Sequence, residues 1–421
     1  MRIILFLFAL FSALEGYSQN QPISSDSLET SSKPVIKESP FSTGFYPVGF
    51  FDIDLTYPIK INNYESFRFG FGGITNDRLL ENFKFGGHIA YGTKDKGLKW
   101  SLGGKARLAK KSNTWIDLYH IEDIIEIGDF SYLTDATVYS IFEPRLVNIT
   151  QFYKHRTWKS AITHEFSDLI VSELRVANIK IEQIEDYRFL NDGVEFNDYG
   201  LAEATASVRF NSKQKEFMGE NGLIQKTDII PNISGQITQG LRGIGDGDFN
   251  YTKLGLKLEY DINRPNLSKT SFLLDTNVAF GDVPLTHLFH AYPNSPTKET
   301  ILQRFSVAGI QSFETMFFGE FFSTELATLH LKHYFRPFKI SERIQPELVI
   351  ISRHALGNFQ NPENHLLVSF NTLDKLYNEF GFELNKLIFG FGTSLAYRYG
   401  SYYLSDFEDN ISFKFTFNLK I

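Results

Sequence analysis

The chain has 421 residues, no cysteine, 15% aromatic residues and a formal net charge of −7. The lack of cysteine excludes disulfides, cysteine-ligated zinc, thiol nucleophiles and lipid attachment at a processed N-terminal cysteine. Both signs of charge are spread along the chain without a basic block, so we expect no nucleic-acid partner.

The first residues have the pattern of a secretory signal. Arg2 provides a positive start, residues 3–14 are apolar, and Gly16-Tyr17-Ser18 offers a cleavage context. Because the apolar stretch is too short to anchor the chain in a membrane, we expect a signal peptide at residues 1–18 and Sec-type export. Residues 19–44 are rich in Ser, Thr, Pro and charge and are predicted to be a flexible leader.

From residue 45 to residue 421 the chain is a succession of short alternating segments, in which apolar and polar residues point to opposite faces of predicted β-strands. The clearest segments lie at 67–72, 98–103, 200–210, 253–262, 327–332, 379–384 and 389–399. No later stretch is apolar for eighteen residues, so a transmembrane helix is excluded. The mean hydropathy of −0.19 conceals the pattern, because the two faces cancel in the average.

The alternating segments predict an all-β fold, a transmembrane antiparallel β-barrel of about sixteen strands counted from Glu65 onward. A soluble β-sandwich is the alternative, but its strands are usually shorter than the ten residues reached here. Residues 123–144 are the least clear segment and are expected to hold a short helix or a long loop.

Catalytic and metal-binding patterns are weak. Residues 163–168 contain His164, Glu165 and Ser167, but on a strand His164 and Ser167 point to opposite faces. The glycines and aspartates of residues 239–250 fit a calcium loop poorly. His287 and His290 lack a carboxylate at ligand spacing. We therefore expect no enzyme activity, no cofactor and no metal.

Two segments are long enough to fill the lumen of such a barrel. One is residues 21–58, and the other is the connection at 280–308, which contains His287, His290, Tyr292 and Arg304. Long connections without regular structure are often functional. An ordinary extracellular loop is the alternative for the second segment.

The last eleven residues alternate throughout. Their apolar face is expected to contact hydrocarbon and to serve as the C-terminal membrane-strand signal. The face begins at Ile411, and the residues expected to form the signal are Phe413, Phe415, Phe417, Leu419 and Ile421.

Several short motifs together resemble an uncharacterised outer-membrane family whose members usually carry a carboxypeptidase-regulatory-like domain before the barrel. The first is Asn62-Asn63-Tyr64-Glu65-Ser66-Phe67-Arg68, where Ser66 replaces the glycine of the family pattern. The motifs that follow are at residues 72–76, 91–95, 316–321, 333–335 and 377–385.

That family is similar in turn to the bacterial surface antigen superfamily, the BamA-like barrels, whose members have sixteen strands and insert or export proteins and lipids. The resemblance implies a long loop folded into the lumen. It places Arg304 near that loop and Glu320 on the strand that follows, as candidates for a lock between loop and wall. The usual Val-Arg-Gly-Phe/Tyr loop motif is not intact here, and no POTRA-type repeat is recognisable.

The resemblance leads us to expect a role in inserting or translocating protein or lipid at the outer membrane, alone or as an accessory subunit. The expected partners are outer-membrane lipids, the barrel assembly machinery that inserts the protein itself, and an envelope protein or lipid cargo. The alternatives are a passive diffusion channel, motivated by the mixed charges of the polar face, and a structural or receptor barrel.

Overall fold

The computed structural model describes residues 44–135, 144–296, 307–341, 344–388 and 390–417, without the side chains of Ile388 and Phe417. The predicted signal peptide and nearly all of the predicted leader lie outside the described residues.

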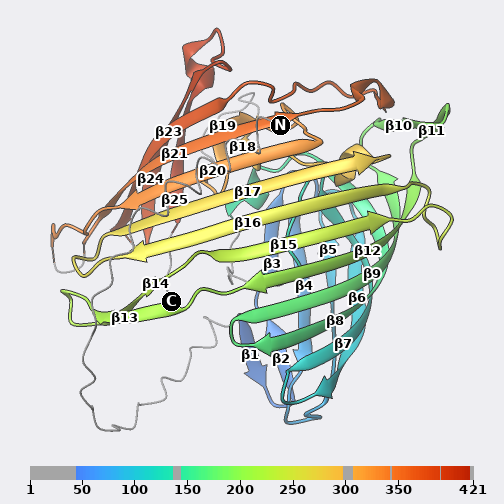
Figure 1. The fold of residues 1–421 in the computed structure, drawn as a ribbon, viewed down its shortest axis with the longest axis horizontal. Coiled ribbons are helices and arrows are strands. Elements are labelled where there is room, and N and C mark those ends of the chain that lie inside the picture. Colours follow the sequence, from blue (N-terminus) through green and yellow to red (C-terminus); the bar gives the residue numbers. More distant parts are fainter. Residues whose placement is uncertain (1–43, 136–143, 297–306, 342–343, 389, 418–421) are drawn as a thin grey trace. The chain divides into compact units, whose positions relative to one another are not determined.

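One antiparallel sheet of eighteen strands dominates the fold (Figure 1). Its strands are β1 (Phe45–Val48), β2 (Phe51–Asp54), β3 (Ile59–Asn62), β4 (Ser66–Thr75), β5 (Phe83–Gly92), β6 (Leu98–Ala109), β7 (Thr114–Glu126), β8 (Phe152–Ser167), β9 (Ile170–Gln183), β12 (Tyr199–Phe210), β15 (Asn232–Gly240), β16 (Tyr251–Asn263), β17 (Lys269–Gly281), β20 (Glu325–Tyr334), β21 (Glu347–Asn358), β23 (Tyr377–Ile388), β24 (Phe391–Gly400) and β25 (Ile411–Phe417).

The remaining elements are short and lie in the connections. They are β10 (Arg188–Asn191), β11 (Val194–Phe196), β13 (Gln214–Met218), β14 (Ile224–Asp228), β18 (Pro293–Ser295), β19 (Phe313–Phe317) and β22 (His365–Leu366), with the 3₁₀ helices η1 (Pro144–Val147), η2 (Leu285–His287), η3 (Pro362–Asn364) and η4 (Phe407–Asn410). No helix in the described ranges is long and apolar enough to cross a membrane.

Seventeen of the eighteen strands occupy sixteen positions across the sheet, and β1 lies beyond them, paired with β2. β2 and β3 share the first position, because both pair with β4, one with each half of it. Each of the fifteen strands from β4 to β25 then pairs with its predecessor in the sheet. The predicted antiparallel barrel of about sixteen strands is confirmed. The count differs by one from Glu65 onward, where the sheet has fifteen strands, because the first position precedes Glu65 as two halves of four residues each.

The sheet is not closed by any ladder among the described residues. β25 pairs with β24, and no pairing joins it to β1, β2 or β3. We call the boundary between β25 and the first position the seam.

Polarity is inverted relative to a water-soluble protein. Outward residues are apolar and exposed, as shown by Leu102 at 65%, Leu174 at 61% and Phe71 at 52%. Inward residues are charged and buried, as shown by Glu379 at 0% and Arg353 and Arg398 at 1% each. A monomeric soluble protein rarely exposes so much contiguous apolar surface, whereas a barrel in lipid requires it.

Most of the long connections lie at one end of the strands, whereas the connection that holds β13 and β14 lies at the other. The first end, which we call the loop end, holds the described parts of residues 127–151, 184–198, 241–250, 282–324, 359–376 and 401–410. The C-terminal residues of β25 lie at the opposite end. Figure 1 shows the hairpin β10–β11 at one end of the sheet and the hairpin β13–β14 at the other.

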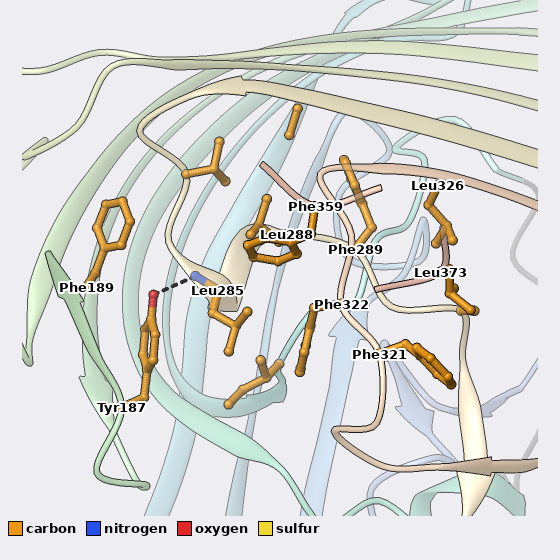
Figure 2. Packing of buried hydrophobic residues seen from close by; sticks show 14 of the residues in the cluster. Tyr187, Phe189, Leu285, Leu288, Phe289, Phe321, Phe322, Leu326, Phe359 and Leu373 are labelled. Carbon is orange, nitrogen blue, oxygen red and sulfur yellow. Dashed lines mark hydrogen bonds between the residues drawn. The ribbon is translucent and has the colours of Figure 1, made fainter. Parts of the chain in front are cut away.

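Two of these connections turn into the concave side of the sheet. They are the inner segment (residues 282–324, of which 297–306 lie outside the described residues) and the inner loop (residues 127–135). Leu285, Leu288, Phe289, Phe321 and Phe322 of the inner segment pack in one core with loop residues such as Phe359 and Leu373 (Figure 2). This core, which we call the cap, fills the loop end of the interior.

We expect Leu102→Arg to destabilise the folded barrel by about 2–4 kcal/mol, because it places a charge near the middle of the outward face of β6. The measurement is the fraction of protein that migrates as the compact, heat-modifiable band in SDS. Leu102→Met is the matched control and is expected to keep the wild-type fraction. A normal compact band for the Arg variant would contradict the lipid-facing assignment.

Candidate functional site

The inner segment begins where β17 ends in a left-handed glycine. Gly281 has φ of +87°, and a Cβ there would lie 2.6 Å from the carbonyl oxygen of Asn250. Only glycine adopts this backbone without strain. The chain therefore leaves the sheet at Gly281 and enters the interior, and the part of residues 280–308 that the structure describes is not an ordinary exposed loop.

Glu314 of β19 anchors the inner segment to the last strand. Its carboxylate lies 2.7 Å from the ammonium group of Lys414 in β25 and accepts hydrogen bonds from the Ser312 hydroxyl and the Asn294 amide. Burial alone would raise the pKa of Glu314, but Lys414 and Arg353 outweigh burial and lower it. The pair is thus a charged, fully buried link between inner segment and wall.

Thr315 provides a second anchor. Its backbone N–H and its hydroxyl both donate to Glu379 of β23, at 2.7 and 2.6 Å. The other carboxylate oxygen of Glu379 accepts from Arg353 of β21 at 2.5 Å. The Tyr377 hydroxyl lies 2.9 Å from that of Thr315. Thr315 therefore binds β23 directly and is linked to β21 through Glu379.

Glu320 provides the third anchor. Its carboxylate accepts two hydrogen bonds from the Arg398 guanidinium of β24, at 2.7 and 3.1 Å. The expected position on the following strand is wrong: Glu320 lies in the turn after β19, still within the inner segment, because the chain makes a further turn before β20 begins at Glu325. Arg304, the other candidate for a lock, lies outside the described residues.

The inner segment also contacts the seam. The Ala308 N–H donates to the Phe415 carbonyl oxygen at 2.8 Å, and Val307 forms a parallel bridge with Phe415. Because β25 pairs with β24 through its other edge, this bridge lies on the side of the last strand that faces the seam. The inner segment thus joins the interior of the barrel to the edge of its last strand.

The inner loop anchors the opposite part of the interior. The Tyr132 hydroxyl donates to Asp275 of β17 at 3.0 Å, and Asp135 pairs with Arg209 of β12 and Lys257 of β16. The sequence predicted a short helix or a long loop at residues 123–144. The structure extends β7 to Glu126 and then forms this loop.

The first sheet position is interrupted by a residue that points inward. Tyr57 lies between β2 and β3, and its ring stacks on His88 of β5 with ring centroids 4.3 Å apart. A Cβ on Gly72 would lie 2.6 Å from the Tyr57 ring, so this glycine makes room for it. Residues 21–58 were predicted from the sequence to be long enough to fill the lumen. The structure places β1 and β2 in the sheet, Tyr57 on the inner side, and residues 21–43 outside the described ranges.

The Asn62–Arg68 motif forms the turn between β3 and β4. The Asn62 amide donates to Glu65 at 2.6 Å, the Glu65 N–H donates back to Asn62, and Arg68 pairs with Asp123 at 2.7 Å. Ser66, which replaces the family's glycine, has φ of +64°. That left-handed backbone favours glycine, which explains why the family pattern has one there.

The outward face of β25 agrees with the predicted C-terminal signal where it is described. Phe413 and Phe415 are 48% and 40% exposed, and Ser412, Lys414 and Thr416 are buried. Leu419, Ile421 and the side chain of Phe417 lie outside the described residues, so the role of these five residues as a signal stays a prediction.

The weak catalytic and metal patterns do not converge. His164 hydrogen-bonds Thr114 at 2.8 Å. His290 lies 3.0 Å from Glu126, which also binds Arg145, whereas His287 contacts Thr286. In the described part of the chain, no group of three or more His, Cys, Asp or Glu residues could hold a metal.

Several anchor residues lay within motifs noted in the sequence, but their partners were not predicted. Tyr377, Glu379 and Glu320 belong to the motifs at 377–385 and 316–321, and alternation placed Lys414 and Arg398 on a polar face. Alternation gives the face of each residue but not the residue opposite it. No sequence pattern indicated that Glu314 or Thr315 would be an anchor residue.

Comparison with known proteins supports the fold. The chain is similar to the crystal structure of BamA from Haemophilus ducreyi lacking POTRA domains 1–3, with a TM-score of 0.53 and 10% identity over 87% of this chain and 70% of that one. It is also similar to CdiB from Acinetobacter baumannii, with a TM-score of 0.39 and 10% identity over 84% of this chain and 57% of that one. That second likeness is too distant to support a conclusion.

No protein-family model matches the sequence, and no curated protein matches it either. The resemblance to BamA-like barrels is thus supported only by the structural likeness to BamA, which concerns the fold. The narrower resemblance to the family with a carboxypeptidase-regulatory-like domain stays a prediction.

We expect Glu314→Gln to lower the stability of the barrel by about 3–5 kcal/mol, because it leaves Lys414 buried without its counter-charge. The temperature at which the compact band in SDS disappears measures the effect. Glu314→Gln combined with Lys414→Met should recover part of the loss. Glu182→Gln is the control, since its exposed pair with Lys154 contributes at most about 1 kcal/mol. Equal effects of Glu314→Gln and Glu182→Gln would contradict the anchoring role.

Proposed function

We propose that this protein acts at the outer membrane in the insertion or translocation of protein or lipid, alone or as an accessory subunit. One observation carries the proposal: an anchored inner segment fills the interior and reaches the last strand at the seam, where no ladder among the described residues closes the sheet. The BamA-like fold supports the proposal without establishing it, because one fold hosts several functions.

The membrane placement is part of the proposal. In outer-membrane barrels the short turns face the periplasm and the longer loops face outward. The loop end, with its cap, would then lie at the cell surface, and the C-terminus would lie in the periplasm. The signal-like residues 1–18 support Sec-type export to that membrane, where outer-membrane lipids and the barrel assembly machinery are the expected partners.

The seam is the surface at which we propose that a cargo protein binds. Unclosed sheet edges are templates for pairing with another chain, and extended segments commonly bind by adding a strand to such an edge. An incoming strand of a cargo protein would pair at β25 in place of the bridge from Val307 and Ala308. The inner segment would therefore cover the edge until a cargo arrives.

A passive diffusion channel is a weaker alternative. The charged inward face motivated it, but the inner segment, the inner loop and the cap occupy the interior, and the inward charges pair with them. A receptor barrel whose loops bind a surface partner is the third reading, and capture of neighbouring envelope proteins would test it.

In planar bilayers we expect the wild-type protein to show a closed or flickering pore of low conductance, because the filled interior leaves little continuous space for water. A compact band in SDS from the same preparation verifies that the protein is folded. A large and stable conductance would favour the diffusion channel over the proposed role.

Joining the inner segment to β25 should block function. The chain has no native cysteine, and Val307 and Phe415 are bridge partners, so Val307→Cys with Phe415→Cys offers a pair near disulfide distance. In cells that depend on this variant, we expect outer-membrane protein or lipid content to fall under oxidising conditions and to recover on reduction.

The matched control is Thr205→Cys with Thr238→Cys, a register pair between β12 and β15 that does not cross the seam. It should form a disulfide without loss of function. Function that persists with the seam oxidised would exclude opening at this place. An unchanged envelope after deletion of the gene would exclude the proposed function altogether.

A further inference from the structure

A small cavity lies at the loop end, apart from the three anchors and the seam. Its volume is about 140 Å³, and it lies between the end of β17, β10, the residue before β20 and residues 360–365. The side chains that matter are those of Phe189, Asp282, Gln360, Asn361, Asn364 and His365. Nothing in the proposed translocation role uses this cavity.

The protonation of His365 follows from its neighbours. The Tyr187 hydroxyl accepts a hydrogen bond from the Leu285 N–H at 2.9 Å (Figure 2) and lies 2.9 Å from Nδ1 of His365. Its single hydrogen is then available for Nδ1. Burial lowers the pKa of His365 to about 4, so the ring is neutral at neutral pH. Nδ1 therefore accepts, and Nε2 carries the proton.

This leaves a hydrogen-bond donor without a partner. His365 is 8% exposed, and in the described residues nothing accepts a hydrogen bond from its Nε2. Nε2 is not one of the fully buried unpaired polar atoms in the described part of the chain, so it is open to the cavity. Because His365 lines the cavity, a ligand or water inside it is the available acceptor.

Three other polar side chains of the cavity are also available, whereas the Gln360 amide donates to Glu325 and the Thr324 hydroxyl to Asn358. The side chains of Asp282, Asn361 and Asn364 make no hydrogen bond to any described residue. A carboxylate accepts only, whereas each carboxamide both donates and accepts. Phe189 adds one buried apolar wall. The cavity therefore presents donors and acceptors together, beside a single aromatic ring.

This set of lining residues disfavours several classes of ligand. No Lys or Arg lines the cavity, which disfavours an anion. A fixed N–H donor and a single carboxylate disfavour a metal cation. A mostly polar wall disfavours an apolar ligand. The volume is close to that of a cavity of about 150 Å³ that holds one benzene ring, so the site accepts one small ring and not a chain.

We propose that this cavity binds one neutral sugar ring at the cell surface. Sugar hydroxyls both donate and accept, which matches His365, Asp282 and the two asparagines. The apolar C–H face of a sugar would lie against Phe189. The ring could be a free monosaccharide or the end of a surface polysaccharide, since both present the same chemistry.

Saturation-transfer NMR on the full-length protein in detergent tests the proposal, with the methyl glycosides of glucose, galactose and mannose as probes. At least one should receive saturation from the protein. Asp282→Asn should weaken that sugar at least about tenfold, because it removes a charged acceptor, and Asn364→Ala should weaken it less.

Asp192→Asn is the matched control, since Asp192 lies in the neighbouring β10–β11 turn and pairs with Arg242. It should leave binding unchanged. If Asp282→Asn gives no compact band in SDS, that variant is not folded, and the effect of Asn364→Ala on sugar binding alone tests the proposal. Transfer to none of the three sugars, or equal transfer in the cavity variants, would show a water-filled cavity and overturn the proposal.

A competition experiment distinguishes a free monosaccharide from the end of a polysaccharide as the ligand. Dextran, galactan or mannan is added to the complex with the corresponding methyl glycoside. Displacement by the polymer would support the end of a polysaccharide as ligand, and no displacement would support a free sugar. Loss of sugar binding leaves the translocation role untouched, because that role depends on the seam and not on this cavity.

Discussion

The fold depends on the constraint that hydrocarbon provides no partner for a polar group. Each strand in such a solvent must satisfy its backbone through its neighbours and must send its polar side chains to the side away from lipid. The result is a sheet with exposed Leu102 and Phe71 and with Arg353 and Glu379 almost fully buried. In water this arrangement would be unfavourable, because the outer face exposes a large contiguous apolar surface.

Burying so many charges imposes a second requirement, because the inward side chains need counter-charges inside the barrel. The wall provides some of them, as in the pair of Arg353 with Glu379. The inner segment provides Glu314 for Lys414 and Glu320 for Arg398, and the inner loop provides Asp135 for Arg209 and Lys257. Filling the interior is therefore part of the electrostatics of the wall as well as a barrier to solutes. A segment held by such pairs has a defined position, and this position includes the seam.

Much of the fold could be predicted from the sequence, because strand facing depends on local alternation. The outward Phe413 and the inward Lys414 of β25 follow directly from period two. The candidate site was harder to predict. The motifs contained Glu320 and Glu379, and the resemblance implied an inward loop, but the pairing of Glu320 with Arg398 joins residues 78 positions apart. At Ser66 the structure instead explains the family pattern, because the left-handed backbone there, with φ of +64°, favours the glycine that the family has.

The sequence by itself determined the class of fold, the face on which each side chain lies and the number of strands to within one or two. These properties follow from neighbours along the chain, and alternation records them residue by residue. Only the tertiary structure decided which charges meet, that the chain turns inward after Gly281, and that the bridge from Val307 reaches Phe415. Those contacts join segments far apart in the sequence, and their geometry depends on the curvature and register of the whole sheet, which no local pattern encodes.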